Sequence, residues 1–387
     1  MPFAPLENPE WLSSWKSAGK EDAQRLSSVE HYGIGIDAVV PDTEPTAFVA
    51  PEYRVEASKG LELSTWKEAL AQEETAVFLE RLFSSTLIPS ARTHLGALGR
   101  SQFASALVVY VQPTLDDAGI AIEETLLLET TLPPAQSADL VIIIAKTGSR
   151  FRLTERTIGG SDASVFARTT IVVTEEDAKV YGETSATASG FVHHEVVGIV
   201  GPYAAVKWRE EPNVSGNYRS LTMLRLVGPS AEGEVLSLLI ADGTRKADVL
   251  AEVEHCADET RARVLAAGVA TDSARIVYRG NIRMKEGVHA TDGDQEGRFL
   301  VLAPTARVDA IPALDIASKD VRSTHKLSVS HVKSDDLFYA QARGIPESGA
   351  RTLALEGFFG TLIAKSAGAE LSEEFRERIA RLDPPSQ

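Results

Sequence analysis

A series of short apolar and β-branched runs constrains the fold of this chain more than any other feature. Between about residues 103 and 333 the runs are, in order, ALVVYVQ, LVIIIA, TTIVVT, LTMLRLV, VLSLLIA, ARIVYRG and FLVLA. Each is bounded by Gly, Pro, Asp, Asn or Ser, which is the pattern of strands joined by turns. No long amphipathic helix interrupts the series, so we do not expect strands that alternate with helices.

A weak internal repeat suggests how these strands are arranged. A small or polar turn, then alanine, then an extended segment recurs at Ala178, Ala204, Ala231, Ala274 and Ala306, with spacings of 26, 27, 43 and 32 residues. The coils of a β-solenoid would give such a repeat, because each coil buries its apolar face on the next one. Since the period is irregular, a sandwich or jelly roll stays open.

The sequence divides into three regions, which we place at residues 1–95, 96–333 and 334–387. The first is mixed and helix-prone. Thr65 and Glu68 resemble a capping box, and apolar residues then recur at helical spacing through about Phe83. Gly and Pro between about 31 and 60 suggest irregular chain. The second region is the β-rich core.

The third region is predicted to be helical. Ser334 can start one short helix, Pro346 fits the first turn of the next, and Ser372 can cap the last. These helices carry much apolar surface for so short a segment. Packing on the core and a groove for a partner protein are both open readings.

Charge and cysteine content exclude several classes of function. The chain has 39 Lys and Arg against 55 Asp and Glu, a net charge of −16, which argues against binding to duplex nucleic acid or to anionic lipid. The single cysteine, Cys256, rules out an intrachain disulfide and a four-cysteine metal cluster within one chain. It fits a reducing compartment, and we read it as a buried structural thiol.

The sequence also shows no targeting signal that we recognise. Its first residues lack a basic segment followed by an apolar one, so no signal peptide is expected. No apolar run approaches the roughly 20 residues that a membrane helix needs. We therefore expect a cytoplasmic protein that does not span a membrane.

Common catalytic motifs are absent from the sequence. The string nearest to a phosphate-binding loop, GTLIAKS at 360–366, lacks the second glycine and falls within a predicted helix. The many carboxylates match no paired motif. A solenoid with an acidic face could be a polysaccharide lyase or hydrolase, but such enzymes need stacking aromatics, and aromatic residues make up only 6% of the chain.

Histidines offer a weak metal-binding signal. His193 and His194 are adjacent, so on a strand they would face opposite sides and could not share one ion. His325 and His331 are six residues apart and could share one face of a continuous strand. Two histidines alone make a weak metal site.

The stretch from about 253 to 359 resembles the SufBD family of iron–sulfur cluster assembly proteins. The matching segments are VEHCADETRARVLAAGV, ARIVYRGNIRMKEGVHATDGDQ, RFLVLAPTARVDAIPALDI, DVRSTHKLSV and LFYAQARGIPESGARTLALEGFF. Within them the family pattern falls on His255, Thr260, Gly280, Ile282, Ala290, Thr291, Asp292, Gln295, Ala306, Pro312, Leu314, Ile316, Leu337, Phe338, Tyr339, Arg343, Gly344, Ile345, Ala350 and Phe358. A fainter match extends upstream, and residues 1–59 match poorly.

The resemblance implies a fold and a function. It implies a mainly β protein, with a right-handed parallel β-helix core flanked by helical N- and C-terminal regions. It implies a scaffold that is not an enzyme, with no tightly bound cofactor, on which a transient iron–sulfur cluster forms. The cluster would be shared with a SufB-like subunit or a second copy of this chain.

The resemblance also implies that an ABC-type ATPase similar to SufC docks on the C-terminal region. The residues expected to bind it are Leu337, Phe338, Tyr339, Arg343, Phe358 and Phe359.

Departures from the family pattern argue against part of the cluster chemistry that the resemblance implies. The position of the sulfur-accepting cysteine of SufB is occupied by Gly297, so a SufB role is disfavoured and a SufD-like one is favoured. The Cys-Ser-His of SufD-like chains reads Ser323-Thr324-His325 here. His325 is thus the candidate residue for cluster assembly and iron binding, although Lys326 places a cation next to it in the sequence. A family member that has lost this chemistry and is only structural is an alternative.

Overall fold

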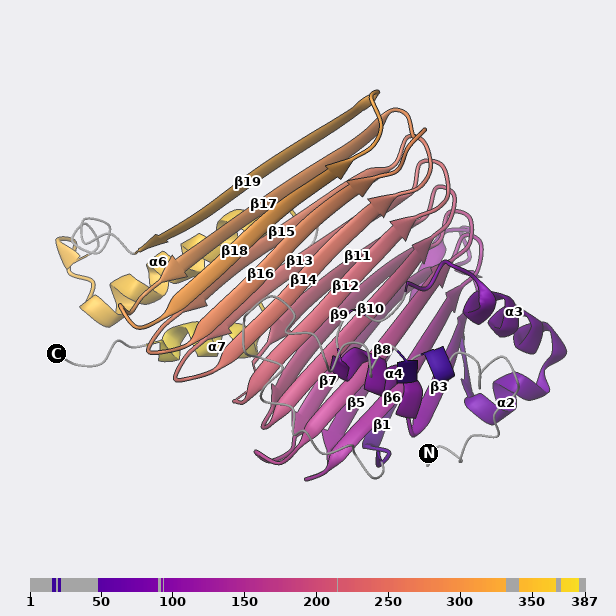
Figure 1. The fold of residues 1–387 in the computed structure, drawn as a ribbon, viewed down its shortest axis with the longest axis horizontal. Coiled ribbons are helices and arrows are strands. Elements are labelled where there is room, and N and C mark those ends of the chain that lie inside the picture. Colours follow the sequence, from indigo (N-terminus) through magenta and orange to yellow (C-terminus); the bar gives the residue numbers. More distant parts are fainter. Residues whose placement is uncertain are drawn as a thin grey trace.

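The dominant feature of the molecule is a parallel coil of strands that winds back and forth between two sheets (Figure 1). The computed structural model describes residues 16–18, 20–21, 48–89, 92, 94–213, 215–331, 341–366 and 370–382. From β5 onward, odd-numbered strands belong to one sheet and even-numbered strands to the other. The predicted β-solenoid, about seven turns long with helices near both ends, is therefore confirmed.

The two sheets are named A and B. Sheet A contains, in spatial order, β18 (Arg307–Ile316), β16 (Arg275–Met284), β14 (Lys246–His255), β12 (Asn217–Leu226), β10 (Phe191–Val200), β8 (Val165–Thr174), β6 (Gln136–Ala145), β3 (Ser105–Val111) and β2 (Leu61–Thr65). Sheet B contains β1 (Glu52–Ala57), β5 (Ala121–Leu132), β7 (Arg150–Gly159), β9 (Lys179–Ala188), β11 (Ala205–Pro212), β13 (Glu232–Ala241), β15 (Arg261–Ala270), β17 (Thr291–Val301) and β19 (Val321–His331), with β4 (Thr114–Leu115) attached to β5. The helices are α2 (Trp66–Ala71), α3 (Glu73–Ser84), α4 (His94–Gln102), α6 (Glu347–Ile363) and α7 (Glu373–Arg381).

The alanine repeat marks the turns of the coil. Ala178, Ala204 and Ala231 each end a turn that leads into sheet B, whereas Ala274 and Ala306 end turns that lead into sheet A. Paired positions on β13 and β15 are 29 residues apart, so the spacing of 43 is about one and a half coils. The period looked irregular because the repeat passes from one stack of turns to the other.

Side chains of the coil alternate between its interior and its outer faces, as the pleat of a strand requires. The interior is filled by one large apolar cluster that runs from Leu107 to Phe299. Outside sheet A, α2, α3 and α4 cover the first coils through residues such as Trp66 and Leu79. Outside sheet B, α6 and α7 pack on β13, β15 and β17. Strands covered on both faces read as continuous apolar runs.

Several sequence-based expectations for the first region are settled by the structure. The capping box at Thr65 and Glu68 is confirmed, but the single helix expected after it is interrupted at Gln72. The prediction of irregular chain is wrong for Glu52–Ala57, which form β1 because they pair antiparallel with β5. Residues 22–47 lie outside the described part of the chain. The boundary placed at 95 falls inside α4.

The C-terminal helices pack against the core. The Ser372 hydroxyl accepts the Phe375 N–H at 3.1 Å to cap α7, as predicted. Pro346, expected in the first turn of α6, is its N-cap, one residue earlier. The helix expected to start at Ser334 lies outside the described residues. Among the residues that are described, no helix is long and apolar enough to cross a bilayer.

One acidic group inside the coil gives the fold a distinct response to pH. Glu210 is 1% exposed and accepts hydrogen bonds from the Ser237 hydroxyl at 2.5 Å and the Tyr218 hydroxyl at 3.2 Å. Burial raises the pKa of this carboxyl, because the charged form loses its hydration. The folded state therefore holds the proton of Glu210 more tightly than the unfolded state does.

This arrangement predicts how stability changes with pH in Glu210→Gln. A raised folded pKa stabilises the protein below the unfolded value of about 4.3, and that contribution is lost as pH rises through the folded value. Glutamine cannot ionise, so the variant does not suffer this loss. The difference in Tm between Glu210→Gln and the wild type should therefore shift by a few degrees in favour of the variant as the pH rises from about 5 to about 8. Glu176→Gln, in an exposed turn, is the control, and its Tm should differ from that of the wild type by the same amount at every pH. Parallel Tm profiles for Glu210→Gln and wild type would contradict the assignment.

Candidate functional site at the open end of the coil

The two ends of the coil finish differently. At one end the outermost described strands are β1 and β2, of six and five residues, which run antiparallel to their neighbours. At the other end β18 and β19, of ten and eleven residues, are the outermost strands of the described chain, and β19 lies at the upper margin of Figure 1. Within the described residues, the outer N–H and C=O groups of these two strands have no strand to pair with, which makes them a template for another chain.

The interior face of the last coil is also uncovered. No further described coil stacks on it, so apolar residues that would be buried elsewhere are partly exposed. Ile316 of β18 is 43% exposed and Val329 of β19 is 45% exposed. Pro312 lies on β18, where an edge strand tolerates a residue without an N–H. The open end thus combines unpaired backbone with apolar side chains.

His325 lies in the middle of this end. It is on β19 in register with Gln295 of β17, on the strand face that continues the coil interior, and its ring is exposed. Ser323 is on the same face two residues earlier, and Gly297 is on that face of β17. The structure therefore brings together the three positions that the sequence singled out. Their role in cluster assembly remains a prediction.

Lys326 does not lie beside His325 in space. Adjacent residues of a continuous strand point to opposite faces, so the lysine projects outward from β19 while the imidazole projects toward the interior side. The adjacency of Lys326 and His325 in the sequence therefore does not by itself place the ammonium group against the imidazole.

The histidine pair expected on β19 is not a joint metal site. His325 and His331 share a face, but six residues of strand separate them by about 20 Å. His331 Nδ1 lies 3.0 Å from the Val301 carbonyl oxygen. In the described part of the chain no three His, Cys, Asp or Glu residues are grouped to hold a metal ion. Any metal bound at His325 needs further ligands from elsewhere.

Beneath His325 lies a group of buried polar residues that sequence reasoning missed as functional. The Gln295 side chain and the Tyr278 ring are 1% and 0% exposed. A Cβ at Gly280 would lie 2.1 Å from Gln295 Nε2 and 3.0 Å from the Tyr278 hydroxyl, so the glycine leaves the space that the amide fills. Gly280 and Gln295 both belong to the family-like segment, which was the available signal.

Gly297 occupies a buried position next to the open end. A Cβ there would lie 3.3 Å from Leu327 Cδ1 and 3.4 Å from the Phe299 ring, a tight but adjustable fit. A cysteine at this position would therefore point into the last coil. Glycine offers no sulfur, so this chain cannot accept a persulfide here.

Cys256, His193 and His194 occupy structural positions in the coil. Cys256 is half-buried, and burial together with Glu254 raises the pKa of its thiol, which keeps it a poor nucleophile. His194 lies between the rings of Phe166 and Tyr218, at 5.9 and 6.0 Å, and burial lowers its pKa to about 3. His193 occupies the outer face of the same strand, as predicted.

The family-like pair His255 and Thr260 staples a turn. The Thr260 hydroxyl donates to the Ala257 carbonyl at 3.0 Å, so His255 Nδ1–H donates to that hydroxyl at 2.7 Å. Burial lowers the pKa of His255 to about 4, which keeps it neutral. This motif maintains the coil rather than a site.

The residues expected to bind an ATPase fall in different places. Leu337, Phe338 and Tyr339 lie outside the described residues. Arg343 is exposed just before α6, and Phe358 is half-buried.

Phe359 is not a surface residue. It is 0% exposed, and its ring packs edge-on against Phe375 at 5.0 Å. Its predicted place in a docking surface is therefore corrected to one in the core. The outer face of α6 instead presents Leu353, 53% exposed, and Gly357, where a Cβ would meet no atom within 4 Å.

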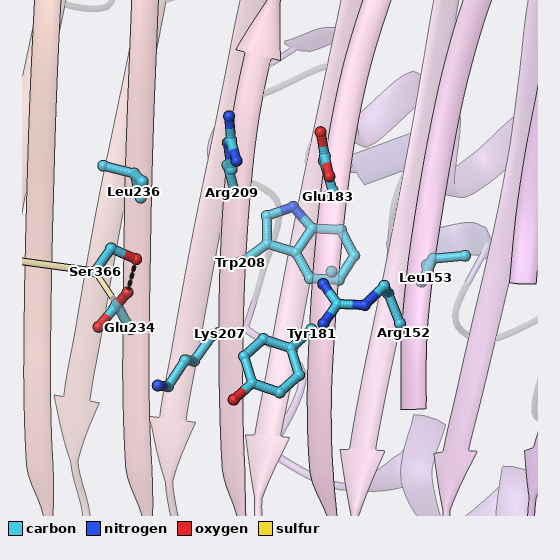
Figure 2. Close-up of a pocket in the computed structure, with 11 residues that line it drawn as sticks. Arg152, Leu153, Tyr181, Glu183, Lys207, Trp208, Arg209, Glu234, Leu236 and Ser366 are labelled. Carbon is cyan, nitrogen blue, oxygen red and sulfur yellow. Dashed lines mark hydrogen bonds between the residues drawn. The ribbon is translucent and has the colours of Figure 1, made fainter. Parts of the chain in front are cut away.

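A hollow on the outer face of sheet B is a candidate for the carbohydrate site of the alternative hypothesis (Figure 2). Tyr181 and Trp208 line it, but Trp208 is only 1% exposed. The Arg152 and Lys207 cations lie 5.0 and 5.5 Å from the centre of the Tyr181 ring. Glu234 in the same hollow bonds to Ser366 and Arg263. A ring flanked by cations and a carboxylate already in use do not favour sugar stacking and acid–base catalysis.

Comparison with known proteins agrees with the geometry. The family model described as "SUF system FeS cluster assembly, SufBD core domain" matches residues 129–358. The iron–sulfur cluster assembly protein SufD of Bacillus subtilis (strain 168) is 28% identical over 230 residues, which cover 58% of this chain and 52% of that protein.

Two mycobacterial relatives carry the same family name. An iron–sulfur cluster assembly SufBD family protein of Mycobacterium leprae (strain TN) is 29% identical over 251 residues, 62% of this chain and 28% of its own length. One of Mycobacterium tuberculosis (strain ATCC 25618 / H37Rv) is 31% identical over 164 residues, 40% of this chain and 41% of its own length. The matches thus span about half or less of these relatives. Because the family model covers more than half of the chain, from β5 to within α6, the chain belongs to the SufBD family.

Proposed function

We propose that this chain is a SufD-like scaffold subunit for iron–sulfur cluster assembly, without catalytic activity of its own. The observation that carries the proposal is the uncapped pair of strands β18 and β19 with His325 on their interior side. The family match and the likeness to a protein named SufD support it.

The partner at the open end is a SufB-like subunit or a second copy of this chain. Either could add strands to the free edges and cover the exposed Ile316 and Val329. This chain contributes one imidazole to the nascent cluster, so thiolate and further ligands come from the partner. Gly297 and Ser323, where cysteines are expected, assign sulfur acceptance to the partner as well.

An ABC-type ATPase similar to SufC docks, in this proposal, on the outer face of α6. That helix is held rigidly on sheet B, and its C-terminal end connects to strands near the site. Lys365 pairs with Glu296 of β17, and the Lys365 carbonyl accepts from Arg263 of β15 at 2.8 Å. Movement of the ATPase could therefore reach β17, the strand that pairs with β19.

Leu353→Glu tests the docking surface. A charge on the exposed face of α6 should weaken binding of a SufC-like ATPase by about tenfold or more, which is about 1.4 kcal/mol, in titration calorimetry. Ile120→Glu is the matched control, because this residue is 65% exposed on the hairpin near the end formed by β1 and β2. Unchanged affinity in Leu353→Glu would remove α6 from the proposal. Deleting residues 334–387 is a poorer test, because the deletion would also expose Leu238 and Leu265, which α6 and α7 cover.

His325→Ala tests the assembly site. After anaerobic reconstitution with SufB- and SufC-like partners, the complex should lose most of its iron, because the imidazole ligand is gone while an exposed residue leaves the fold intact. His331→Ala, on the same face of β19, should keep its iron. Equal iron in wild type and His325→Ala would favour the alternative that this chain is only a structural half of the complex.

A further inference from the structure

Gln295 is an unusual residue for the interior of an apolar coil. Its side chain is 1% exposed, and neither its amide oxygen nor its amide nitrogen has a hydrogen-bond partner within the described part of the chain. An amide left in this state costs about 1–3 kcal/mol for each unpaired group. Such a cost in a native core calls for an explanation.

The surroundings of Gln295 fix where its amide lies. Nε2 and the Tyr278 hydroxyl are both within 3.0 Å of the point that a Cβ of residue 280 would occupy. The nitrogen is therefore on the Tyr278 side, which leaves Oε1 for another donor. The Tyr278 hydroxyl is itself buried without a partner among the described residues, and burial raises its pKa, so it keeps its proton.

The donor nearest in register is the imidazole of His325. Paired residues on neighbouring parallel strands lie about 5 Å apart, with side chains on the same face. Ser323 lies two residues along β19 from His325, in register with Gly293, and is therefore farther from Gln295. The His325 ring is exposed, so it is free to rotate toward this amide.

We propose that Gln295 is a positioning residue that accepts one N–H of His325 and so fixes the tautomer and orientation of the ring. The space left by Gly280, next to the Tyr278 hydroxyl, accommodates the amide. A histidine that binds a metal commonly donates its other ring N–H to a carbonyl, which leaves the second nitrogen free as the ligand. The iron-binding part of this inference rests on the proposed function, whereas the tautomer does not.

The test is ¹⁵N NMR of the histidine rings of the purified full-length chain at about pH 8.5, where an ordinary imidazole is neutral. His325→Ala identifies the signals. In the wild type, the two ring nitrogens of His325 should give well-separated resonances, one from a protonated and one from an unprotonated nitrogen. A single averaged position for both nitrogens in the wild type would overturn the inference.

Three variants sharpen the result. Gln295→Leu removes the amide, and Gly280→Ala displaces it, because a Cβ there would meet Gln295 Nε2. Both should collapse the two resonances toward an average. Asp294→Asn changes the neighbouring residue, which faces outward and accepts from Thr324 at 2.5 Å, and should leave them separated. Separated resonances that survive in both Gln295→Leu and Gly280→Ala would contradict the role of Gln295.

The measurement needs no partner, iron or ATPase. If the NMR result holds and His325→Ala keeps its iron in the reconstituted complex, the proposed function fails while the positioning role stands. If the NMR result fails and iron is lost in His325→Ala, the assembly site stands without the contribution of Gln295.

Discussion

Every strand of this coil depends on the next coil for its backbone hydrogen bonds. In a parallel ladder each N–H and C=O along a strand must find its partner on a neighbouring strand, and buried groups without partners are costly. Ten-residue strands repeated about every 29 residues meet this requirement throughout the middle of the molecule. The requirement fails at an end, where the last coil has no neighbour. A solenoid must therefore cap its ends or share them.

The two ends of the described coil differ. Short antiparallel strands form one end, while the longer parallel strands β18 and β19 form the other. The open end carries His325, with Gln295 and Tyr278 below it. In the proposed function a site at this unpaired edge is incomplete alone, since the missing ligands and the missing strand pairings can both come from one partner. Lys365, just after α6, connects the outside of sheet B to β17 in the same region.

The sequence predicted the coil because its apolar runs are strands buried on both faces. Strands such as β9 and β11 gave no apolar run and showed only as extended segments after Ala178 and Ala204, because their outer faces are polar and their interior positions include small residues such as Gly182. The sequence could not predict contacts between residues that lie on different coils. The approach of Gln295 to Gly280 depends on how two sheets meet, and no local pattern reports it. Phe359 and Leu353 are both large apolar residues of one predicted helix. Only the packing of that helix on β15 determines that Phe359 is buried and Leu353 is exposed.

Backbone amide hydrogen exchange of the terminal strands tests the central claim most directly. The isolated chain should exchange the amides of residues 307–331 faster than those of the inner coils, because the terminal strands have free edges. In the complex with a SufB-like partner, or in a dimer of this chain, the same amides should become slow while those of β1 and β2 stay unchanged. No new protection at 307–331 in the complex, or protection that appears at β1 and β2 instead, would contradict the account.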